Sequence, residues 1–408
     1  MHPSLFSNTE IQRFIFEYDL KNIDALYFGK PVFNEISNSE IAAQIERRAH
    51  VQRKLPSWFE KSEALYPPKE NLAQSSSELT ALKKTALLKG LMQELHISNE
   101  CAADLTSGFG VDAHVMGEHF QRFDSVEVNQ ELLSLQQHNC NSFKIKNRSF
   151  HHSKAFDFLK QAYNVLYIDP SRRDAYRKQL IDLRQCEPNC IQHYDQLSAL
   201  SDLFLIKASP MVDISQSLKM LPNCFRVDLI TVHFELKEIL FFNAKQKGSV
   251  EPEIHVHHYR KDSLQWSVFS LDKYKAEYQD ITIKPLSNFL FEPHPGMMKA
   301  QCSAEISSRF QCAALHHNTQ LFTADEDRIL FEGRRFKVID HFSFSKRNMK
   351  AITGGHFHVV SKNFKRSVHE IRKQFKLKEG KEEYLFFTQE REPIVIRAIR
   401  IDRNQIEN

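Results

Sequence analysis

Three short motifs, each at the end of an apolar run, carry side chains suited to holding a nucleoside-type ligand. The first is Asp104-Leu105-Thr106-Ser107-Gly108-Phe109-Gly110-Val111-Asp112, which follows an apolar segment and leads into a helical stretch. Its two glycines lack the Cβ atoms that would keep a ligand away from backbone N–H groups. The second motif is Val126-Glu127-Val128-Asn129. Its carboxylate stands at a strand end, where nucleoside-binding folds accept both ribose hydroxyls.

The third motif is Tyr167-Ile168-Asp169-Pro170-Ser171-Arg172-Arg173-Asp174. It is an apolar strand that ends abruptly in Asp-Pro, at the edge where open α/β sheets bind their ligands. A lone Gly-x-Gly is weak information, because ordinary strand-to-helix turns contain it. Three strand ends in this order predict a nucleoside cofactor site much more specifically.

The elements that must position these motifs are short apolar runs alternating with helical stretches, the pattern of a parallel sheet with helices on its faces. We expect strands at 101–105, 125–128, 164–168, 203–207, 238–242 and 254–259. The last two are separated by residues 243–252, and we expect them to form an antiparallel pair at one end of the sheet. The fold class is therefore α/β.

The region before this sheet is expected to be helical. Ser39 is placed to cap a helix with Ile41, Ile45 and Val51 on or near one face. A second helix is expected to begin within residues 75–78. Its apolar side would consist of Leu79, Leu82, Leu88, Leu91 and Leu95.

The region after the sheet begins with the proline-containing segment 284–295. Prolines there cannot continue a central strand or helix, so we expect a domain boundary. Residues 337–343, 357–360, 383–387 and 394–401 have strand composition. Ser367 and Glu370 form a capping-box pattern that opens a helix with Val368, Ile371 and Phe375 inward. The pattern predicts a small α+β domain.

Composition limits the class of protein. The 408 residues are 41% hydrophobic and 26% charged, with a net charge of +4. No apolar run approaches the roughly 20 residues of a membrane helix, and the N-terminus lacks signal-peptide features, which predicts a cytoplasmic protein with no membrane partner. The seven cysteines form no CxxC pair, so we expect reduced thiols. Residues 333–403 contain 18 Lys or Arg against 8 Asp or Glu, a net of +10 that would suit a polyanion.

The histidines are not expected to bind a metal. His255 and His257 would face one side of a strand and His258 the other, and no Cys or Asp partner matches them. His151 and His152 are expected in a loop. We predict no metal site.

The order Asp-x-Thr-x-Gly-x-Gly, an acidic strand end and Asp-Pro-x-Arg resembles the class I methyltransferases, which use S-adenosylmethionine. Gln74-Ser75-Ser76-Ser77-Glu78-Leu79-Thr80-Ala81 and Phe291-Glu292-Pro293 extend this resemblance to bacterial methyltransferases with a C-terminal THUMP-like domain. Their catalytic domain is similar to RNA guanine-N2 and trimethylguanosine methyltransferases. The resemblance covers most of residues 70–408. It implies a helical domain at 1–78, a Rossmann-like seven-stranded methyltransferase domain at 79–284, and a basic THUMP-like α+β domain at 285–408 that presents RNA.

The resemblance also implies roles for residues. The cofactor would contact Asp104, Thr106, Gly108, Phe109, Gly110, Asp112, Glu127, Val128, Asn129, Phe150 and Asp169. Within this set the glycine loop surrounds the methionine end, Asp112 fixes the loop and Glu127 holds the ribose. Asn129 and the loop after the third strand, near Ser149 and Phe150, lie by the adenine.

The expected target pocket is formed by Asp169, Pro170, Ser171 and Arg172, which are the predicted catalytic residues. The substrate would also meet Arg173, Lys207, Lys362, Lys365 and Arg366. Methyl transfer from a sulfonium asks mainly for alignment of nucleophile, methyl and leaving sulfur, so no strong base is required.

Two departures from related enzymes bear on the substrate. Amine methyltransferases usually have an aromatic residue after Asp-Pro-Pro or Asn-Pro-Pro, whereas Ser171 and Arg172 stand here. Arg172 could instead lie flat on a base or hold a phosphate. Uridine C5 methyltransferases need a cysteine after the next strand, and Lys207-Ala208-Ser209-Pro210 contains none, which argues against that mechanism.

Methyl transfer to a nucleobase nitrogen of RNA is thus the favoured function. The alternatives are a degenerate fold that binds RNA without catalysis and a methyltransferase for a small molecule or a protein. A nicotinamide dehydrogenase is disfavoured, because Thr106 stands where the first fingerprint glycine belongs. The sequence leaves the methylated atom and the oligomeric state open.

Overall fold

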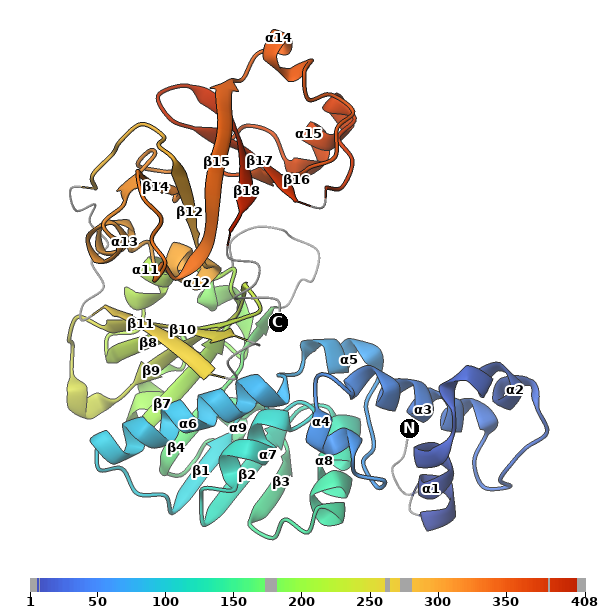
Figure 1. The fold of residues 1–408 in the computed structure, drawn as a ribbon. Coiled ribbons are helices and arrows are strands. Elements are labelled where there is room, and N and C mark those ends of the chain that lie inside the picture. Colours follow the sequence, from blue (N-terminus) through green and yellow to red (C-terminus); the bar gives the residue numbers. More distant parts are fainter. Residues whose placement is uncertain are drawn as a thin grey trace. The chain divides into compact units, whose positions relative to one another are not determined.

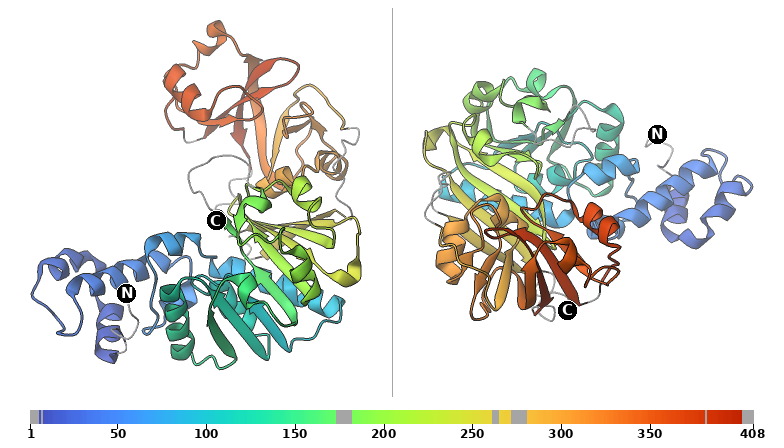
Figure 2. Two further views of the ribbon diagram at one scale, coloured as in Figure 1. Left: turned by 180° about the vertical axis from the view of Figure 1, so that it is seen from behind. Right: turned by 90° about the horizontal axis from the view of Figure 1, so that it is seen from above.

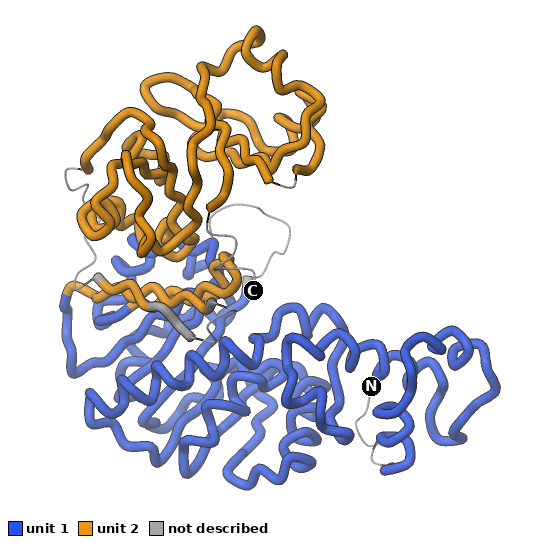
Figure 3. The backbone as a smooth tube through the Cα atoms, viewed as in Figure 1, with its two compact units in different colours: residues 1–226, 239–250 blue, residues 227–238, 251–408 orange. Residues whose placement is uncertain are grey.

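The computed structural model describes residues 6, 8–172, 182–260, 265–271, 281–380 and 382–401 (Figure 1). The chain forms two compact units (Figure 3). Unit 1 contains residues 1–226 and 239–250, and unit 2 contains residues 227–238 and 251–408. The three-domain division with boundaries at 78 and 284 stays a prediction.

The larger sheet has nine strands in the order β11-β10-β8-β9-β7-β4-β1-β2-β3. Their bounds are β1 (Cys101–Asp104), β2 (Arg122–Glu127), β3 (Arg148–His152), β4 (Tyr163–Ile168), β7 (Ser201–Ala208), β8 (Cys224–Val232), β9 (Glu235–Asn243), β10 (Glu253–Arg260) and β11 (Gln265–Leu271). Strands β1, β2, β3, β4 and β7 are parallel, and β9 is antiparallel to β7. The predicted Rossmann-like α/β fold is confirmed. Figure 2 gives two further views of these elements.

From residue 78 onward, helices of unit 1 alternate with the strands of the larger sheet, as a parallel sheet requires. They are α6 (Glu78–Glu94), α7 (Val111–Gly117), α8 (Gln130–Ser142), α9 (Ala155–Phe158), α10 (Tyr194–Ala199) and α11 (Ile214–Leu218). Ser77 caps α6 by accepting from the N–H of Thr80, so the predicted start of this helix is confirmed. Leu88 and Leu91 are buried as expected, but Leu82 is exposed and Lys84 takes a place on the buried side.

The N-terminal region is helical, as predicted. It contains α1 (Thr9–Glu17), α2 (Ile23–Phe28), α3 (Asn38–Val51), α4 (Pro56–Phe59) and α5 (Lys69–Gln74). The expected cap of α3 was wrong by two residues: Ser37 rather than Ser39 caps it, in a capping box with Glu40. Ser37 is the cap because its side chain accepts from the N–H of Glu40, while the Glu40 side chain accepts from the N–H of Ser37. Ile41 and Ile45 are buried as expected.

Two expectations about the edges of the larger sheet were wrong. Strands β9 and β10 are not neighbours, because β8 lies between them. His151 and His152, with Ser149 and Phe150, lie in strand β3 rather than in a loop. Its side chains are half-buried or exposed, so β3 lacks the continuous apolar run that marks a central strand.

The second sheet, in unit 2, has the order β13-β14-β12-β15-β18-β17-β16. Its strands are β12 (Phe289–Pro293), β13 (Ala313–Ala314), β14 (Phe322–Ala324), β15 (Gly333–Ser343), β16 (His358–Ser361), β17 (Glu383–Gln389) and β18 (Pro393–Arg400). The four predicted C-terminal strands are confirmed. The prediction that segment 284–295 excludes a central strand is wrong, because β12 pairs with both β14 and β15. Pro293 is the last residue of β12, where its lack of an N–H is tolerated.

The helices of unit 2 are α12 (Pro295–Lys299), α13 (Ser303–Phe310), α14 (Lys346–Met349) and α15 (Val368–Phe375). The capping box of Ser367 and Glu370 at the start of α15 is confirmed, and Ile371 and Phe375 are buried. Within the described ranges, no helix is both long and apolar enough to cross a membrane. The same residues contain no group of three or more His, Cys, Asp or Glu side chains arranged to hold a metal.

Candidate active site

The three motifs meet at the carboxyl ends of β2, β1 and β4, which are neighbouring parallel strands. The N–H of Gly108 donates to Oε2 of Glu127 at 2.8 Å. The N–H of Asp169 donates to Oγ1 of Thr106 at 2.7 Å. The glycine loop is thus bonded to the strand end on each side of it, and the three motifs form one continuous edge.

The glycine loop is packed on one side and open on another. Gly108 and Gly110 have φ of 53° and 89°, a region that strongly favours glycine. A Cβ on Gly110 would lie 2.7 Å from Cγ of Gln136, whose Nε2 donates to Ser107 Oγ and Gly108 O. Among the described residues, a Cβ on Gly108 would have one neighbouring atom within 4 Å, the carbonyl oxygen of Thr106 at 3.9 Å. A ligand can therefore approach the backbone at Gly108. Gln136 was missed by sequence analysis, which had no reason to single out one polar residue of a helix.

Glu127 is a rigid acceptor. Its side chain is nearly buried, its Oε2 accepts from Gly108 and its Oε1 accepts from the N–H of Asn129, both at 2.8 Å. A carboxylate offers about four lone-pair positions, so both oxygens keep capacity for ribose hydroxyls. Asn129 caps α8 by accepting from the N–H groups of Glu131 and Leu132, which commits its Oδ1 to the helix. Val128 is 61% exposed between them.

Asp104 is a buried carboxyl at the centre of the site. It is 1% exposed, and its Oδ1 accepts from the N–H of Thr106 at 3.0 Å. Burial raises its pKa well above the usual range, against the lowering effect of that N–H. The carboxylates of Asp112, Asp169 and Glu127 raise the pKa of Asp104 further. A cation entering this edge would be attracted by an acidic cluster and would favour ionisation of Asp104.

Asp169 forms an ion pair with Lys207, which projects from the end of β7. Burial raises the pKa of Asp169, and the charge of Lys207 opposes that effect. Pro170 is buried and Ser171 is exposed. Residues 171–172 form the short strand β5 (Ser171–Arg172), paired with β6 (Cys186–Glu187). Arg173 and Asp174 lie outside the described residues, as does the side chain of Arg172.

Asp112 lies beside the loop, in an ion pair with Lys84. Their atoms Oδ1 and Nζ are 2.8 Å apart, and the Lys84 side chain is completely buried. Burial alone would raise the pKa of Asp112, but the charges of Lys84 and Lys207 outweigh it and the pKa is lowered. Lys84 was not predicted as a site residue, because a lysine in a helix is usually exposed.

Phe109 and Phe150, which were both predicted to contact the cofactor, lie in different surroundings. The Phe109 ring is buried against Trp58 and Tyr66, with ring centres 5.0 and 6.4 Å apart. Phe150 lies within β3, half-buried, in register with Ser125 of β2. Side-chain packing of Phe109 therefore anchors the loop to the helical region.

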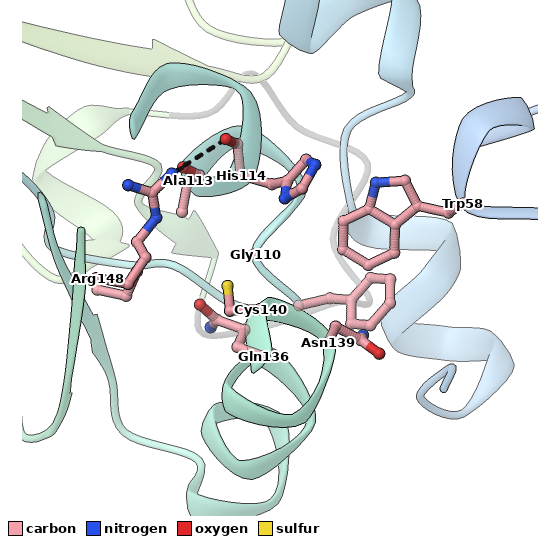
Figure 4. Close-up of a pocket in the computed structure, with 10 residues that line it drawn as sticks. Trp58, Gly110, Ala113, His114, Gln136, Asn139, Cys140 and Arg148 are labelled. Carbon is pink, nitrogen blue, oxygen red and sulfur yellow. Dashed lines mark hydrogen bonds between the residues drawn. The ribbon is translucent and has the colours of Figure 1, made fainter. Parts of the chain in front are cut away.

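A small cavity lies behind the glycine loop (Figure 4). It is lined by Trp58, Phe109, Gly110, Ala113, His114, Ser125, Gln136, Asn139, Cys140 and Arg148. Arg148 donates to the carbonyl oxygens of Ala113 and His114, in the middle of α7, at 2.8 and 3.1 Å. Burial lowers the pKa of His114 to about 4, so this imidazole is neutral at ordinary pH. We interpret these side chains as packing that holds α7 and α8 in place beside the site.

The predicted RNA-binding residues of unit 2 differ in their surroundings. Nζ of Lys362 lies 3.2 Å from Oε1 of Glu292, which is only 1% exposed. Arg366 donates to Gln374, whereas the Lys365 side chain is exposed. Lys365 is therefore the residue of this trio best placed to meet an external anion.

The Rossmann-like sheet and its three converging strand ends define the class I methyltransferase fold. Residues 333–400 match the THUMP domain-like family, and residues 289–331 match a ferredoxin-like domain family. A "putative methyltransferase" of Porphyromonas gingivalis W83 has 22% sequence identity and a TM-score of 0.80, over 97% of this chain and 98% of that chain.

A "putative class I S-adenosylmethionine-dependent methyltransferase" of Listeria monocytogenes has 11% identity and a TM-score of 0.39, over 63% of this chain and 91% of that chain. No curated protein matches the chain. The Porphyromonas structure and the family matches confirm the predicted resemblance at the level of the fold and of the THUMP-like segment. They divide the predicted region 285–408 into two matched segments, of which the ferredoxin-like one was not predicted.

Proposed function

We propose that this protein transfers a methyl group from S-adenosylmethionine to a nucleobase nitrogen of RNA, in the cytoplasm. The observation that carries the proposal is the 2.8 Å bond from the N–H of Gly108 to Glu127. This bond links the backbone at Gly108, which a ligand can approach, with the Glu127 carboxylate, which is suited to bind a ribose. The two groups stand at the ends of adjacent strands. A parallel sheet that serves only as a scaffold does not need this pairing.

The residues at this edge fit the cofactor chemically. S-adenosylmethionine carries a sulfonium and an ammonium group, and when bound it supplies an electrophilic methyl. Asp104 is a buried carboxyl next to three other carboxylates, an environment that stabilises a cation. Gly108 leaves room for the ligand where a side chain would project. Glu127 would hold the ribose, and the exposed Val128 beside it would offer an apolar surface to the adenine.

The acceptor would enter beside Asp169 and Pro170. Asp169 would orient an attacking amino group, and Lys207 holds the carboxylate of Asp169 in place. The reaction depends on alignment of nucleophile, methyl and sulfur, so fixed geometry supplies much of the effect. RNA as the acceptor is supported by the net charge of +10 over residues 333–403 and by the THUMP-like match in the same segment.

A second candidate is a protein of the same fold that binds RNA without catalysis. The ion pair of Asp169 with Lys207 favours it, because a carboxylate already engaged is a poorer acceptor for an amine. The exposed Ser171, at the position of the usual stacking aromatic residue, favours it too.

Calorimetry and methyl-transfer assays test the proposal. We expect binding of S-adenosylmethionine and S-adenosylhomocysteine but not of NAD. Methyl-labelled cofactor should then be incubated with total RNA, protein and metabolite fractions. Label in RNA supports the proposal, and label in another fraction replaces the acceptor. Cofactor binding with no transfer to any fraction favours the non-catalytic candidate, and absence of binding overturns the function.

A further inference from the structure

Lys84 is a fully buried lysine that no sequence motif explains. It lies on α6, its side chain is 0% exposed, and its Nζ is 2.8 Å from Oδ1 of Asp112. The same Nζ donates to Oγ of Ser76 at 2.7 Å. Burying an ammonium group is strongly unfavourable unless good geometry and further hydrogen bonds compensate, so this placement requires the partners that it has.

Asp112 joins three further parts of unit 1 to this lysine. Ser76, just before α6, donates through Oγ to Oδ2 at 2.7 Å. The hydroxyl of Tyr167 on β4 donates to the same Oδ2 at 2.9 Å. Asp112 itself is the second residue of α7, directly after the glycine loop. One carboxylate therefore connects α6, α7, β4 and the segment before α6.

The network touches both halves of the proposed site. Asp112 follows Gly110 by two residues, and Tyr167 precedes Asp169 by two residues on the same strand. A shift of Asp112 would move the glycine loop, and a shift of Tyr167 would move the Asp-Pro step. The bond between the Asp112 and Tyr167 side chains therefore fixes the distance between the glycine loop and the Asp-Pro step.

We propose that Lys84 is a positioning residue for the cofactor site: its ammonium holds Asp112, and Asp112 with Tyr167 holds the glycine loop and Asp169 in register. The inference rests on the proposed function and deepens it. Ser76 and Ser77 then have distinct duties, since Ser76 bonds the ion pair and Ser77 caps α6.

Stability alone is a weak reason for such a pair. Replacing a buried ion pair by apolar side chains of similar volume is often neutral or stabilising, whereas removing one partner is strongly destabilising. A positioning role instead uses the direction of the bonds, which an apolar pair lacks.

The charges around Asp112 make the role measurable. It faces Lys84 from α6, Ser76, Tyr167 from β4 and Lys207 from β7, and it interacts with the carboxyls of Asp104 and Asp169. The two lysines keep the pKa of Asp112 low although burial raises it. Without Lys84 the pKa of Asp112 must rise, and so must the pKa of Asp169, because the charge of Lys84 lowers both.

The experiment compares Lys84→Met, Asp112→Asn and the double variant, with Lys89→Met as the control. Lys89 lies on the same helix and is exposed. The dissociation constants of S-adenosylmethionine and S-adenosylhomocysteine are measured by calorimetry from mildly acidic to mildly alkaline pH, with melting temperatures in parallel.

We expect Lys84→Met to weaken cofactor binding by at least about tenfold, a loss comparable to that caused by removing the hydrogen-bond partner of a metal ligand. As the solution is acidified, the variant should also lose affinity at a higher pH than the native protein does, because Asp112 now takes up a proton more readily. This new pH dependence should disappear in Lys84→Met/Asp112→Asn, where no carboxyl remains at position 112 to titrate. Lys89→Met should match the native protein.

Native affinity in a folded Lys84→Met overturns the inference, and so does weaker binding with the native pH profile, which would indicate only a structural effect. If Lys84→Met does not fold, Tyr167→Phe decides, because it removes one hydroxyl and keeps the ring. Weaker binding by Tyr167→Phe with a small change in melting temperature supports the inference, and native binding overturns it. Failure of the native protein to bind either cofactor would instead contradict the proposed function.

Discussion

Asp169 and Lys207 form an ion pair at the carboxyl ends of the neighbouring strands β4 and β7. The Asp169 side chain is 33% exposed and that of Lys207 is 12% exposed, so the pair borders the site without being sealed in it. Lys207 opposes the rise in the pKa of Asp169 that burial causes. Lys207 therefore increases the fraction of Asp169 that is ionised at a given pH.

Removal of that charge should shift the pH dependence of methyl transfer. In Lys207→Met the pKa of Asp169 rises further, so the ionised carboxylate is lost at a higher pH as the solution is acidified. We expect the acidic limb of the rate profile to move to higher pH and the rate near neutrality to fall by about tenfold or more. Lys207→Arg keeps the charge and should leave the limb close to its native position. Rate profiles of the two variants, measured at saturating cofactor, provide the check.

Glu127 should matter for binding more than any other single side chain of the edge. Glu127→Ala removes the acceptor for Gly108 and Asn129 as well as the proposed ribose contact. Hydrogen bonds to a charged group contribute about 1.5–3 kcal/mol each, so a loss of about a hundredfold in cofactor affinity is expected. Calorimetry with S-adenosylhomocysteine measures it. Glu131→Ala, on the exposed side of α8, serves as the control. Unchanged affinity in Glu127→Ala would refute the ribose assignment.

The strand-end residues could be found from sequence because their signals are local. Asp104, Glu127 and Asp169 each follow an apolar run, and the edge of a parallel sheet brings such positions together. Lys84 and Gln136 gave no such signal. A lysine or glutamine in a helix is usually exposed, and their burial depends on Asp112 and Gly110, which are distant in sequence.

Sheet order was harder to predict than strand position. The segments of β9 and β10 were identified, but β8, which was not predicted, lies between them, and this pairing is decided by residues far apart in the chain. Edge strand β3 was missed because its side chains, among them His151 and His152, are largely polar and partly exposed. Pro293 misled the prediction for β12, since its position at the end of the strand makes it harmless.

The glycine loop should not tolerate a side chain at Gly110. Gly110→Ala adds a Cβ 2.7 Å from the Gln136 side chain at a φ of 89°, so both packing and backbone oppose it. We expect a loss of about 1–3 kcal/mol in the free energy of unfolding and weaker cofactor binding. Gly90→Ala is the matched control on α6, where a Cβ meets nothing within 4 Å. That variant should be stabilised by up to about 1 kcal/mol, because alanine is the better helix former. Equal melting temperatures for the two variants would contradict the loop geometry.

Asp104 should show opposite effects on stability and on binding. Its pKa is raised in the folded protein, so the stability due to its protonated form is present at low pH and is lost as the pH rises through that raised value. Asp104→Asn keeps an acceptor for the N–H of Thr106 but cannot ionise. Without cofactor, this variant should melt at a higher temperature than the native protein at neutral pH. It should bind S-adenosylmethionine more weakly, since it no longer places a carboxylate opposite a cation. Lower stability together with unchanged affinity would show that Asp104 is an ordinary buried side chain.

Salt dependence should separate an RNA-binding surface from an ordinary basic one. Lys362 is a poor choice for charge reversal, because a glutamate there would face the buried Glu292. Lys365, Lys373 and Lys376 are exposed in the same basic segment, residues 333–403, so their reversal tests the surface without disturbing the core. Each RNA phosphate that a variant no longer neutralises should reduce the slope of log affinity against log salt by about 1, and the triple variant should bind RNA at least about tenfold more weakly at moderate salt.

Reversal of the exposed Lys144 and Lys146 of unit 1 is the matched control for this surface. Because none of the five lysines belongs to the strand-end site, cofactor affinity should stay native in both variants. RNA binding that is insensitive to salt, or equally affected by the control, would remove the basic segment from the proposal.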